Sequence, residues 1–353
     1  MGEPQDGATL AAEPTATAAF AHDAAVARER LAGAVKTLSS GDRPWAVIDE
    51  ALGARWAAAL AAEAAALERA SLLTPHTFAF AAHGGSRQVF EHPGRRYVDL
   101  DPARMQPRTA QVAPLLARFA EQEVAHLLSR LEVTSPELAF AHASVPHVKL
   151  QLTRGEYGCT PCHYDISYSA PTTLQLSILI YLSDGWCQDW GAELHVLPFV
   201  GPPVALEPTF DRAVLFLADR TLHRSLPPRG EGVGQARWLL TVWLDGAGAV
   251  DRALRPGALA PPVQRLVAPA LHCAAYLQAL RQSLPPGEAR TSLLAQQQSE
   301  ITAVEGDLEL VGLLEGLREL QADSEEEKAD PMQDFVAACE PLTKKQRCDI
   351  VPG

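Results

Sequence analysis

The chain is 353 residues long with a hydrophobic fraction of 47%, which suits one large globular domain or one domain with sizeable extensions. Its formal net charge is −13, from 30 Lys and Arg against 43 Asp and Glu. This balance argues against a general nucleic-acid binder, because phosphate contacts need clustered Lys and Arg.

The cysteines indicate a reducing compartment, and the apolar runs indicate whether the chain would enter a membrane. Six cysteines in a chain of this length do not form a disulfide scaffold, and the pair Cys159 and Cys162 lacks the second pair that a zinc site needs. No apolar run reaches the length of a membrane span, and the N-terminus lacks the pattern of a signal peptide. We therefore expect free thiols, no membrane contact and a cytoplasmic or nuclear location.

The chain begins with a segment of low hydrophobicity. Residues 1–43 are rich in Ala, Thr, Glu and Asp, which predicts a flexible leader with a helix over 19–38. A short strand comes directly after the leader. It is followed by an Ala-rich helix that Asp49 or Glu50 would cap and that would run to Ser71.

Residues 44–144 as a whole predict the supporting helices of a catalytic domain. The stretch 72–107 is read as irregular, with loops marked by Gly and Pro, and a second long helix is expected over 109–131. Two helices ahead of a run of strands predict a buttress on the outside of a sheet. The histidines in the irregular stretch lack the paired spacing of ligands and are expected at the surface: His76, His83 and His92.

Residues 145–250 predict an all-β core. Residues 148–152 alternate between apolar and polar side chains, and 173–183 do so most clearly. In the latter strand, apolar residues fill one face and Thr173, Gln175, Ser177 and Tyr181 fill the other. Short strands separated by Gly and Pro turns indicate a sandwich or jelly roll, in which the polar face can form the mouth of a site.

The C-terminal third carries no motif to which we can attach chemistry. Residues 251–321 predict a helical extension, with helices near 263–283 and over 300–321, and residues 322–353 an acidic, weakly ordered tail. A helical cap, a dimer contact and a partner-binding appendage all remain open as its role.

A constellation of polar residues in the β core predicts a metal centre. His163 and Asp165 lie one residue apart on an extended strand and so point to the same face, and a later apolar strand delivers His223. Two His and one carboxylate form the facial triad of non-haem Fe(II) oxygenases. Arg237 opens another strand, where a buried cation needs an anionic partner such as the dicarboxylate 2-oxoglutarate. His195 lies within a strand, and a structural role is expected for it.

The order of these residues resembles the 2-oxoglutarate/Fe(II)-dependent oxygenase superfamily, in its prolyl 4-hydroxylase-like branch and closest to the oxygen-sensing prolyl hydroxylases. The resemblance covers roughly 145–250 and extends weakly over 44–144. The segments that carry it are Cys162-His163-Tyr164-Asp165, Ile180-Tyr181-Leu182-Ser183, Gly191-Ala192-Glu193-Leu194-His195-Val196-Leu197-Pro198, Glu207-Pro208-Thr209-Phe210-Asp211-Arg212, Phe216-Leu217-Ala218-Asp219-Arg220 and Arg237-Trp238-Leu239-Leu240-Thr241-Val242-Trp243.

The resemblance implies a role for each matching position. His163, Asp165 and His223 would ligate Fe(II), and Arg237 would pair with the distal carboxylate of 2-oxoglutarate. Tyr181 would hydrogen-bond the same cosubstrate, and Thr241, on the Arg237 face of its strand, would help to line the pocket. The implied cosubstrates are 2-oxoglutarate and O2, with ascorbate as the reductant and succinate and CO2 as products.

Three positions depart from the pattern. Family members often carry a Tyr ten residues before the metal His and an aromatic residue three before it, where this chain has Thr153 and Thr160. The interval between His223 and Arg237 is also a few residues longer than usual and contains a Gly- and Pro-rich insertion over 227–234.

We therefore expect an α+β chain with a double-stranded β-helix (jelly roll) core, buttressed by N-terminal helices and followed by a helical extension. The expected activity is an Fe(II)- and 2-oxoglutarate-dependent dioxygenase that hydroxylates a prolyl residue of a protein or peptide. Oxygenation of another residue or of a small molecule is an alternative, as is a non-catalytic relative that serves as a binding platform. A nucleic-acid demethylase is disfavoured by the acidic charge. The oligomeric state stays open.

Overall fold

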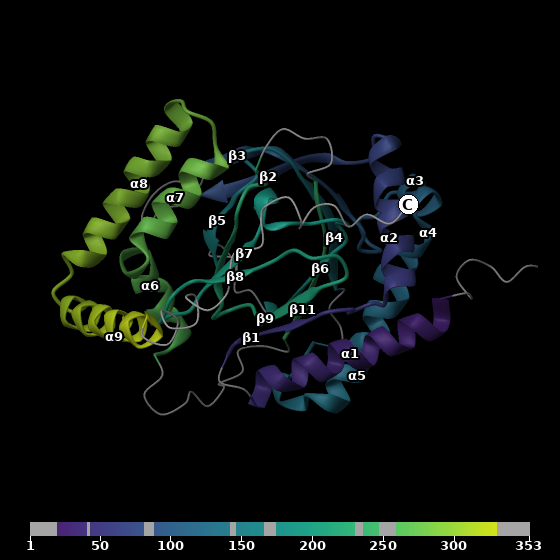
Figure 1. Cartoon of the computed structure of the whole chain (residues 1–353), viewed down its shortest axis with the longest axis horizontal. Coiled ribbons are helices and arrows are strands. Elements are labelled where there is room, and N and C mark those ends of the chain that lie inside the picture. The colour runs from purple at the N-terminus through teal and green to yellow at the C-terminus, as the bar shows by residue number, and fades with distance from the viewer. Residues whose placement is uncertain are drawn as a thin grey trace, which may run out of the picture.

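The computed structural model describes residues 20–40, 43–80, 88–141, 146–165, 174–229, 236–246 and 259–329, with side chains except at 39–40 and 325–329. Two antiparallel sheets lie at the centre, one group of helices packs beside the larger sheet, and a second group packs beside the smaller one (Figure 1). The expected α+β class is confirmed.

The larger sheet has seven strands. In spatial order they are β1 (Trp45–Ile48), β9 (Ala213–Leu217), β6 (Leu174–Tyr181), β11 (Arg237–Asp245), β4 (His147–Thr153), β3 (Gln88–Asp99) and β2 (Thr74–Phe80). The smaller sheet has four: β5 (Thr160–His163), β10 (Leu222–Ser225), β7 (Leu194–Leu197) and β8 (Val204–Leu206).

From β4 onward the chain passes back and forth between the two sheets. β4, β6, β9 and β11 belong to the larger sheet, whereas β5, β7, β8 and β10 belong to the smaller one. This winding is the double-stranded β-helix, or jelly roll, that the short alternating strands predict. Because neighbours in the sheets are distant in sequence, the fold brings β5 beside β10 and β4 beside β11.

Side-chain alternation divides the larger sheet into two faces. The outer face is apolar and packs on the N-terminal helices, as Leu150, Ile178 and Leu240 share a core with Leu60 and Leu131. The inner face meets the smaller sheet and also carries the polar residues of β4, β6 and β11. The expected helical buttress on the outside of a sheet is therefore confirmed.

The buttress consists of five α-helices and one π-helical turn among the described residues. They are α1 (Ala21–Ser40), α2 (Ala54–Arg69), α3 (Pro107–Val112), α4 (Pro114–Arg118), the turn Phe119–Glu123 and α5 (Val124–Thr134). The expected single helix over 109–131 is wrong, because Pro114 forces Ala113 out of the helical region, to φ −132° and ψ 66°. α1 is packed into the core through the buried Leu31 and Val35, so this part of the expected flexible leader is a supporting helix. Residues 1–19 lie outside the described part.

The start of α2 also differs from expectation. Its N-cap is Gly53 rather than Asp49 or Glu50. The carboxylate of Asp211 accepts hydrogen bonds from the backbone N–H groups of Leu52 and Gly53, both at 2.8 Å, and so binds the donors just ahead of the helix. Asp49 instead receives a hydrogen bond from Arg212 at 2.7 Å.

The stretch 72–107, expected to be irregular, contains the two long strands β2 and β3. They extend the larger sheet beyond β4, and their many polar residues hide the period-two pattern in the sequence. His92 is 1% exposed and His76 packs edge-on against Tyr97, so the expectation of surface positions is wrong for both. His83 lies outside the described residues.

The second group of helices covers the outer face of the smaller sheet. It comprises α6 (Pro261–Leu271), α7 (Cys273–Ser283), α8 (Glu288–Glu305) and α9 (Val311–Ala329). α7 packs on β5, and Ala268 and Ala279 share a core with Cys159 and Leu222. The expected helix over 300–321 is interrupted, because α8 ends before Gly306 and α9 begins at Val311. Of the expected weakly ordered tail, the part up to Ala329 continues α9, and 330–353 lie outside the described residues.

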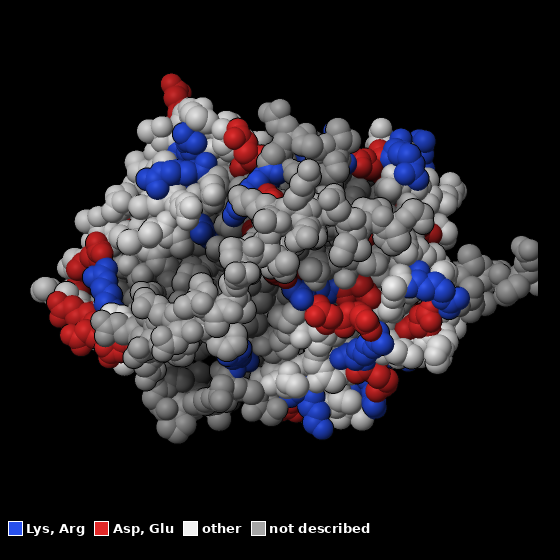
Figure 2. All heavy atoms as spheres, viewed as in Figure 1, with Lys and Arg blue, Asp and Glu red and all other residues white. Residues whose placement is uncertain are grey.

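The surface carries charges of both signs. On the face shown in Figure 2, acidic side chains gather where α8 meets α9, and basic and acidic side chains interleave over the N-terminal helices. The exposed acids of the α8–α9 turn are Glu305, Asp307 and Glu309. Among the described helices, none combines the length and the apolar content that a membrane span requires.

Candidate metal centre and anion site

Three side chains meet between the two sheets at the end of β5. His163 and His223 are directly opposed in the β5–β10 pair, so their rings lie on the same face with centroids 4.3 Å apart. Asp165 follows β5 by two residues, and its Oδ1 lies 3.3 Å from His163 Nε2 and 3.9 Å from His223 Nε2. The three candidate ligand atoms all lie within 4.8 Å of one another.

The backbone fixes the orientation of both imidazoles. His163 Nδ1 lies 2.8 Å from the carbonyl of Pro161, and His223 Nδ1 lies 3.1 Å from the carbonyl of Thr221. A carbonyl accepts a hydrogen bond, so each Nδ1 carries the proton and donates it in that bond, and each Nε2 is left with a lone pair that faces Asp165. Burial lowers the pKa of His223 to about 4, which favours the neutral ring that binds metals.

Asp165 is held as a carboxylate by its neighbours. Burial acts to raise its pKa, but at the low pH where this carboxyl titrates both histidines are protonated, and the hydrogen bond from His163 and the two positive charges outweigh that effect and lower the pKa below its ordinary value. Its Oδ2 accepts hydrogen bonds from Ser177 Oγ at 2.6 Å and from Trp243 Nε1 at 3.0 Å. Two imidazoles and one oriented carboxylate, with space left for further ligands, fit a non-haem divalent iron.

Ser177 and Trp243 were not singled out from the sequence. They are directly opposed in the β6–β11 pair and so reach the carboxylate together from the larger sheet. A signal was present for both. Ser177 lies on the polar face of its strand, and Trp243 shares a face with Arg237 and Thr241.

Arg237 lies on the same inner face, and its partner Ser225 is two residues from His223 on β10. It is 3% exposed, and its guanidinium donates only to neutral acceptors: the Ala192 carbonyl at 2.9 Å, Ser225 Oγ at 3.1 Å and Thr153 Oγ1 at 3.4 Å. Its Nε is buried without a hydrogen-bond partner, and burial lowers its pKa. Among the described residues, no carboxylate lies within ion-pair distance, so the site fits an anion that comes from outside the chain.

The two other expected cosubstrate residues share this inner face. Tyr181 is 1% exposed, and burial raises its pKa to about 12, so its hydroxyl keeps its proton. Thr241 is also buried, but it lies four residues along β11 from Arg237, and its Oγ1 accepts a hydrogen bond from Gln151 at 3.5 Å. Tyr181 therefore lies in the electrostatic reach of Arg237, whereas Thr241 lies closer to the middle of the strand.

The remaining candidates lie away from the three ligands. His195 pairs with Arg224 across β7 and β10, on the face opposite His223. Cys159 and Cys162 are free, buried thiols, as expected, and burial raises the pKa of Cys159 to about 11. A thiol that stays protonated is a poor nucleophile and metal ligand.

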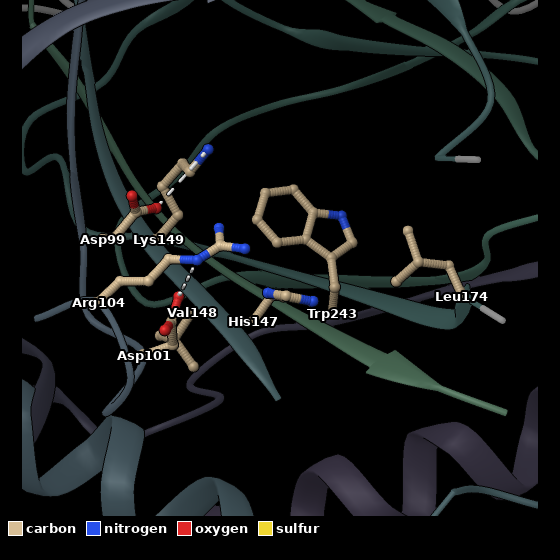
Figure 3. Close-up of a pocket in the computed structure, with 8 residues that line it drawn as sticks. All are labelled: Asp99, Asp101, Arg104, His147, Val148, Lys149, Leu174 and Trp243. Atoms are coloured by element: carbon tan, nitrogen blue, oxygen red, sulfur yellow. Dashed lines mark ion pairs between the residues drawn. The ribbon is translucent and has the colours of Figure 1, made fainter. Parts of the chain in front are cut away.

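A pocket of about 230 Å³ opens next to Trp243, and none of the three candidate ligands lines it. Trp243 links the pocket to the ligands, because its ring lines the pocket while its N–H contacts Asp165. Lys149 lies 4.4 Å from the ring centre of Tyr97 and 3.9 Å from Asp99, and Arg104 pairs with Asp101 at 3.9 Å. Figure 3 shows these charged groups on one side of the Trp243 ring, with Leu174 on the other.

Comparison with known proteins gives a family for this region. Residues 150–245 match the family model described as the 2OG-Fe(II) oxygenase superfamily. No curated protein matches the chain. A solved prolyl 4-hydroxylase of Phytophthora capsici is similar in structure, with a TM-score of 0.64 and 28% identity, over 84% of this chain and 95% of that one.

Two further solved structures are similar to this chain with lower scores. One is a prolyl hydroxylase of Trichoplax adhaerens in complex with a hypoxia-inducible-factor peptide, with 19% identity, a TM-score of 0.48 and coverage of 66% of this chain and 94% of that one. The other is a prolyl 4-hydroxylase of Pseudomonas putida, with 20% identity, a TM-score of 0.47 and coverage of 61% and 98%.

Proposed function

We propose that the chain is a 2OG-Fe(II) oxygenase, the family that residues 150–245 match, and that it hydroxylates a prolyl residue of a protein or peptide. One observation carries the proposal. The inner face of the jelly roll holds a His-Asp-His cluster and, deeper in the same sandwich, a buried arginine that has no carboxylate partner among the described residues. A metal and a dicarboxylate can therefore bind next to each other.

The roles of the residues follow from their positions. His163, Asp165 and His223 would hold Fe(II), with Ser177 and Trp243 orienting the carboxylate. Arg237 would pair with the distal carboxylate of 2-oxoglutarate, with Tyr181 as a hydrogen-bond donor and Thr241 lining the same space. Fe(II) and 2-oxoglutarate, when bound, supply the activation of O2 that inserts oxygen into a C–H bond, with succinate and CO2 as coproducts and ascorbate as the reductant.

The pocket beside Trp243 would receive the substrate. Trp243 links it to Asp165, and charged and aromatic side chains line it, which is the mixture that an extended peptide segment can use. The similarity to the prolyl 4-hydroxylase of Phytophthora capsici, which extends over most of both chains, supports a prolyl residue as the target. The indole of Trp243, which lines the pocket, would offer a flat apolar surface to such a residue.

Turnover of 2-oxoglutarate to succinate, with Fe(II) and ascorbate present, tests this function. The wild type should form succinate, and His163→Ala should lose the activity by about 100-fold or more, because one of the three ligands is gone. His195→Ala is the matched control, since that histidine is on the other face of the same sheet, and its turnover should stay near the wild-type value.

Pro-containing peptides then test the substrate. A hydroxylated peptide gains the mass of one oxygen atom, and the gain should disappear with His163→Ala. Succinate formation with no peptide product would shift the proposal to another residue or to a small molecule. A wild type with neither turnover nor bound iron would contradict the enzyme and favour a binding platform.

A further inference from the structure

Arg95 is a second buried arginine in the same sandwich. It belongs to β3, is 7% exposed and donates hydrogen bonds to Gln151 Oε1 and Thr160 Oγ1. Its Nε is buried without a hydrogen-bond partner. Among the described residues, no carboxylate pairs with it at ion-pair distance.

The strand register brings Arg95 and Arg237 to the same site. Arg95 is opposite Thr153 in the β3–β4 pair, and Arg237 is opposite Thr153 in the β11–β4 pair. The two guanidiniums therefore lie on the same face of the larger sheet, one on each side of the short Thr153 side chain. Arg237 also donates to Thr153 Oγ1 at 3.4 Å.

A pair of hydroxyls joins the two arginines at their other end. Thr160 Oγ1 lies 2.7 Å from Ser225 Oγ, and these hydroxyls accept from Arg95 and Arg237 respectively. The result is a chain of hydrogen bonds that runs from Arg95 through Thr160 and Ser225 to Arg237. A guanidinium has five N–H donors, so both arginines keep donors for a ligand.

Two like charges in a buried site are costly unless an anion joins them. Burial, together with the charge of Arg237, lowers the pKa of Arg95 to about 9, so Arg95 remains cationic at neutral pH. The charge of Asp165 acts on Arg95 in the opposite direction, which puts Arg95 within electrostatic reach of the metal ligands as well as of Arg237. A dianion would match the two positive charges.

We propose that Arg95 is a second cationic contact for 2-oxoglutarate, which meets the dianion on the metal side of Arg237. It would take over the contacts that aromatic residues at positions 153 and 160 would make. Thr153 and Thr160 have short side chains. Arg95 lies opposite Thr153 and donates a hydrogen bond to Thr160, so its side chain occupies the space beside these two threonines. This inference rests on the proposed function, because it assumes that 2-oxoglutarate binds beside the metal centre.

The test measures 2-oxoglutarate binding rather than turnover. Protein loaded with Mn(II), without O2, is titrated with 2-oxoglutarate in a calorimeter, and Mn(II) affinity and thermal unfolding are measured separately. Arg95→Gln keeps hydrogen-bonding capacity but loses the charge. It should raise the dissociation constant of 2-oxoglutarate about tenfold or more and leave Mn(II) affinity within a factor of two or so.

Two further variants separate charge from packing. Arg95→Lys keeps the charge, so it should bind 2-oxoglutarate more tightly than Arg95→Gln. Arg96→Gln is the matched control, because Arg96 is the next residue of β3 but is exposed on the other face, and it should bind as the wild type does.

The outcomes are distinguishable. Wild-type affinity in Arg95→Gln, or an Arg95→Lys protein that binds no better than Arg95→Gln, would overturn the proposal and leave Arg95 as a strut between β3 and β5. Failure of the proposed function has a different signature, because the Mn(II)-loaded wild type would then not bind 2-oxoglutarate. If Arg95→Gln does not fold, the affinity of Arg95→Lys for 2-oxoglutarate is compared with those of Arg96→Gln and Arg237→Gln. Because Arg95→Lys keeps the charge, the proposal predicts a measurable loss of affinity relative to Arg96→Gln that is much smaller than the loss in Arg237→Gln. An affinity of Arg95→Lys equal to that of Arg96→Gln would overturn the proposal.

Discussion

At the scale of single residues, Asp165 links the two sheets. The aspartate extends from the smaller sheet, and Ser177 and Trp243 hold its Oδ2 from the larger one. Hydrogen bonds to a ligating carboxylate set its orientation and so influence metal affinity. Neither partner would have to touch the metal to matter for binding.

Trp243→Phe should therefore weaken the metal site without removing a ligand. The ring and its packing are largely kept, but the hydrogen bond to Asp165 is lost, and we expect metal affinity to fall about 10-fold. Titration with Fe(II) in the absence of O2 measures the change. Trp186→Phe is the control, since its indole N–H donates to the Gly191 carbonyl at 2.7 Å and not to a ligand. Equal affinities in the two variants would contradict an orienting role for Trp243.

At the scale of elements, whether a strand can be predicted from the sequence depends on what covers its two faces. β6 is apolar on one face and polar on the other, and both the strand and its polar face could be predicted, including Ser177 and Tyr181. β2 and β3 could not be predicted, because both carry polar residues on both faces, and β2 is the edge strand of the sheet. Arg95 was missed for the same reason, since its neighbours come from strand pairing across long sequence distances.

The β2–β3 hairpin should give the protein a pH dependence. Burial lowers the pKa of His92 to about 3, whereas in the unfolded chain its pKa is near the ordinary histidine value of 6.5. Between these values the unfolded chain binds the proton and the native protein does not. The free energy of unfolding is therefore highest above about pH 6.5 and falls as the pH is lowered towards 3.

His92→Phe should flatten this dependence. Between its two pKa values, one such histidine changes the free energy of unfolding by about 1.4 kcal/mol per pH unit. A phenylalanine has no titrating group, so it would remove this contribution and still fill the buried position with an aromatic ring. Urea unfolding at several pH values between 4.5 and 7.5 measures it. His22→Phe is the control, because His22 is exposed on α1. A slope equal to that of the wild type would show that His92 does not titrate in this way.

At the scale of the whole molecule, the jelly roll is enclosed by helices on both outer faces. The N-terminal helices cover the larger sheet and could be predicted as a buttress. The C-terminal helices cover the smaller sheet. Of the three roles that the sequence left open for them, a helical cap, a dimer contact and a partner-binding appendage, this packing favours the helical cap. The sequence could not decide this, because Ala-rich helices pair with a sheet only through contacts between distant segments. Ser283 Oγ, for example, donates to the Cys159 carbonyl at 3.0 Å across 124 positions.

Disturbing this cap should damage the metal centre at a distance. Ala279 is fully buried where α7 packs on β5, so Ala279→Glu would bury an unpaired charge and should cost about 3 kcal/mol or more of unfolding free energy. We expect a lower melting temperature and a loss of bound iron. Ala274→Glu introduces the same charge at an exposed position of the same helix and should change neither. Full iron occupancy in Ala279→Glu would mean that β5 holds its position without α7.

The bridge between the sheets also bears on how the protein is made. Asp165 and its partner Trp243 are 78 positions apart in the sequence. His163 and His223 are paired across β5 and β10, and several strands of the jelly roll lie between them in the sequence. During synthesis, the first two ligands leave the ribosome long before the third ligand and before the tryptophan that steadies the carboxylate. Contacts of such long sequence separation form late in folding. A nascent chain thus has no complete set of iron ligands until almost the whole core has been translated. The site therefore reaches its full affinity for iron only after translation of that core.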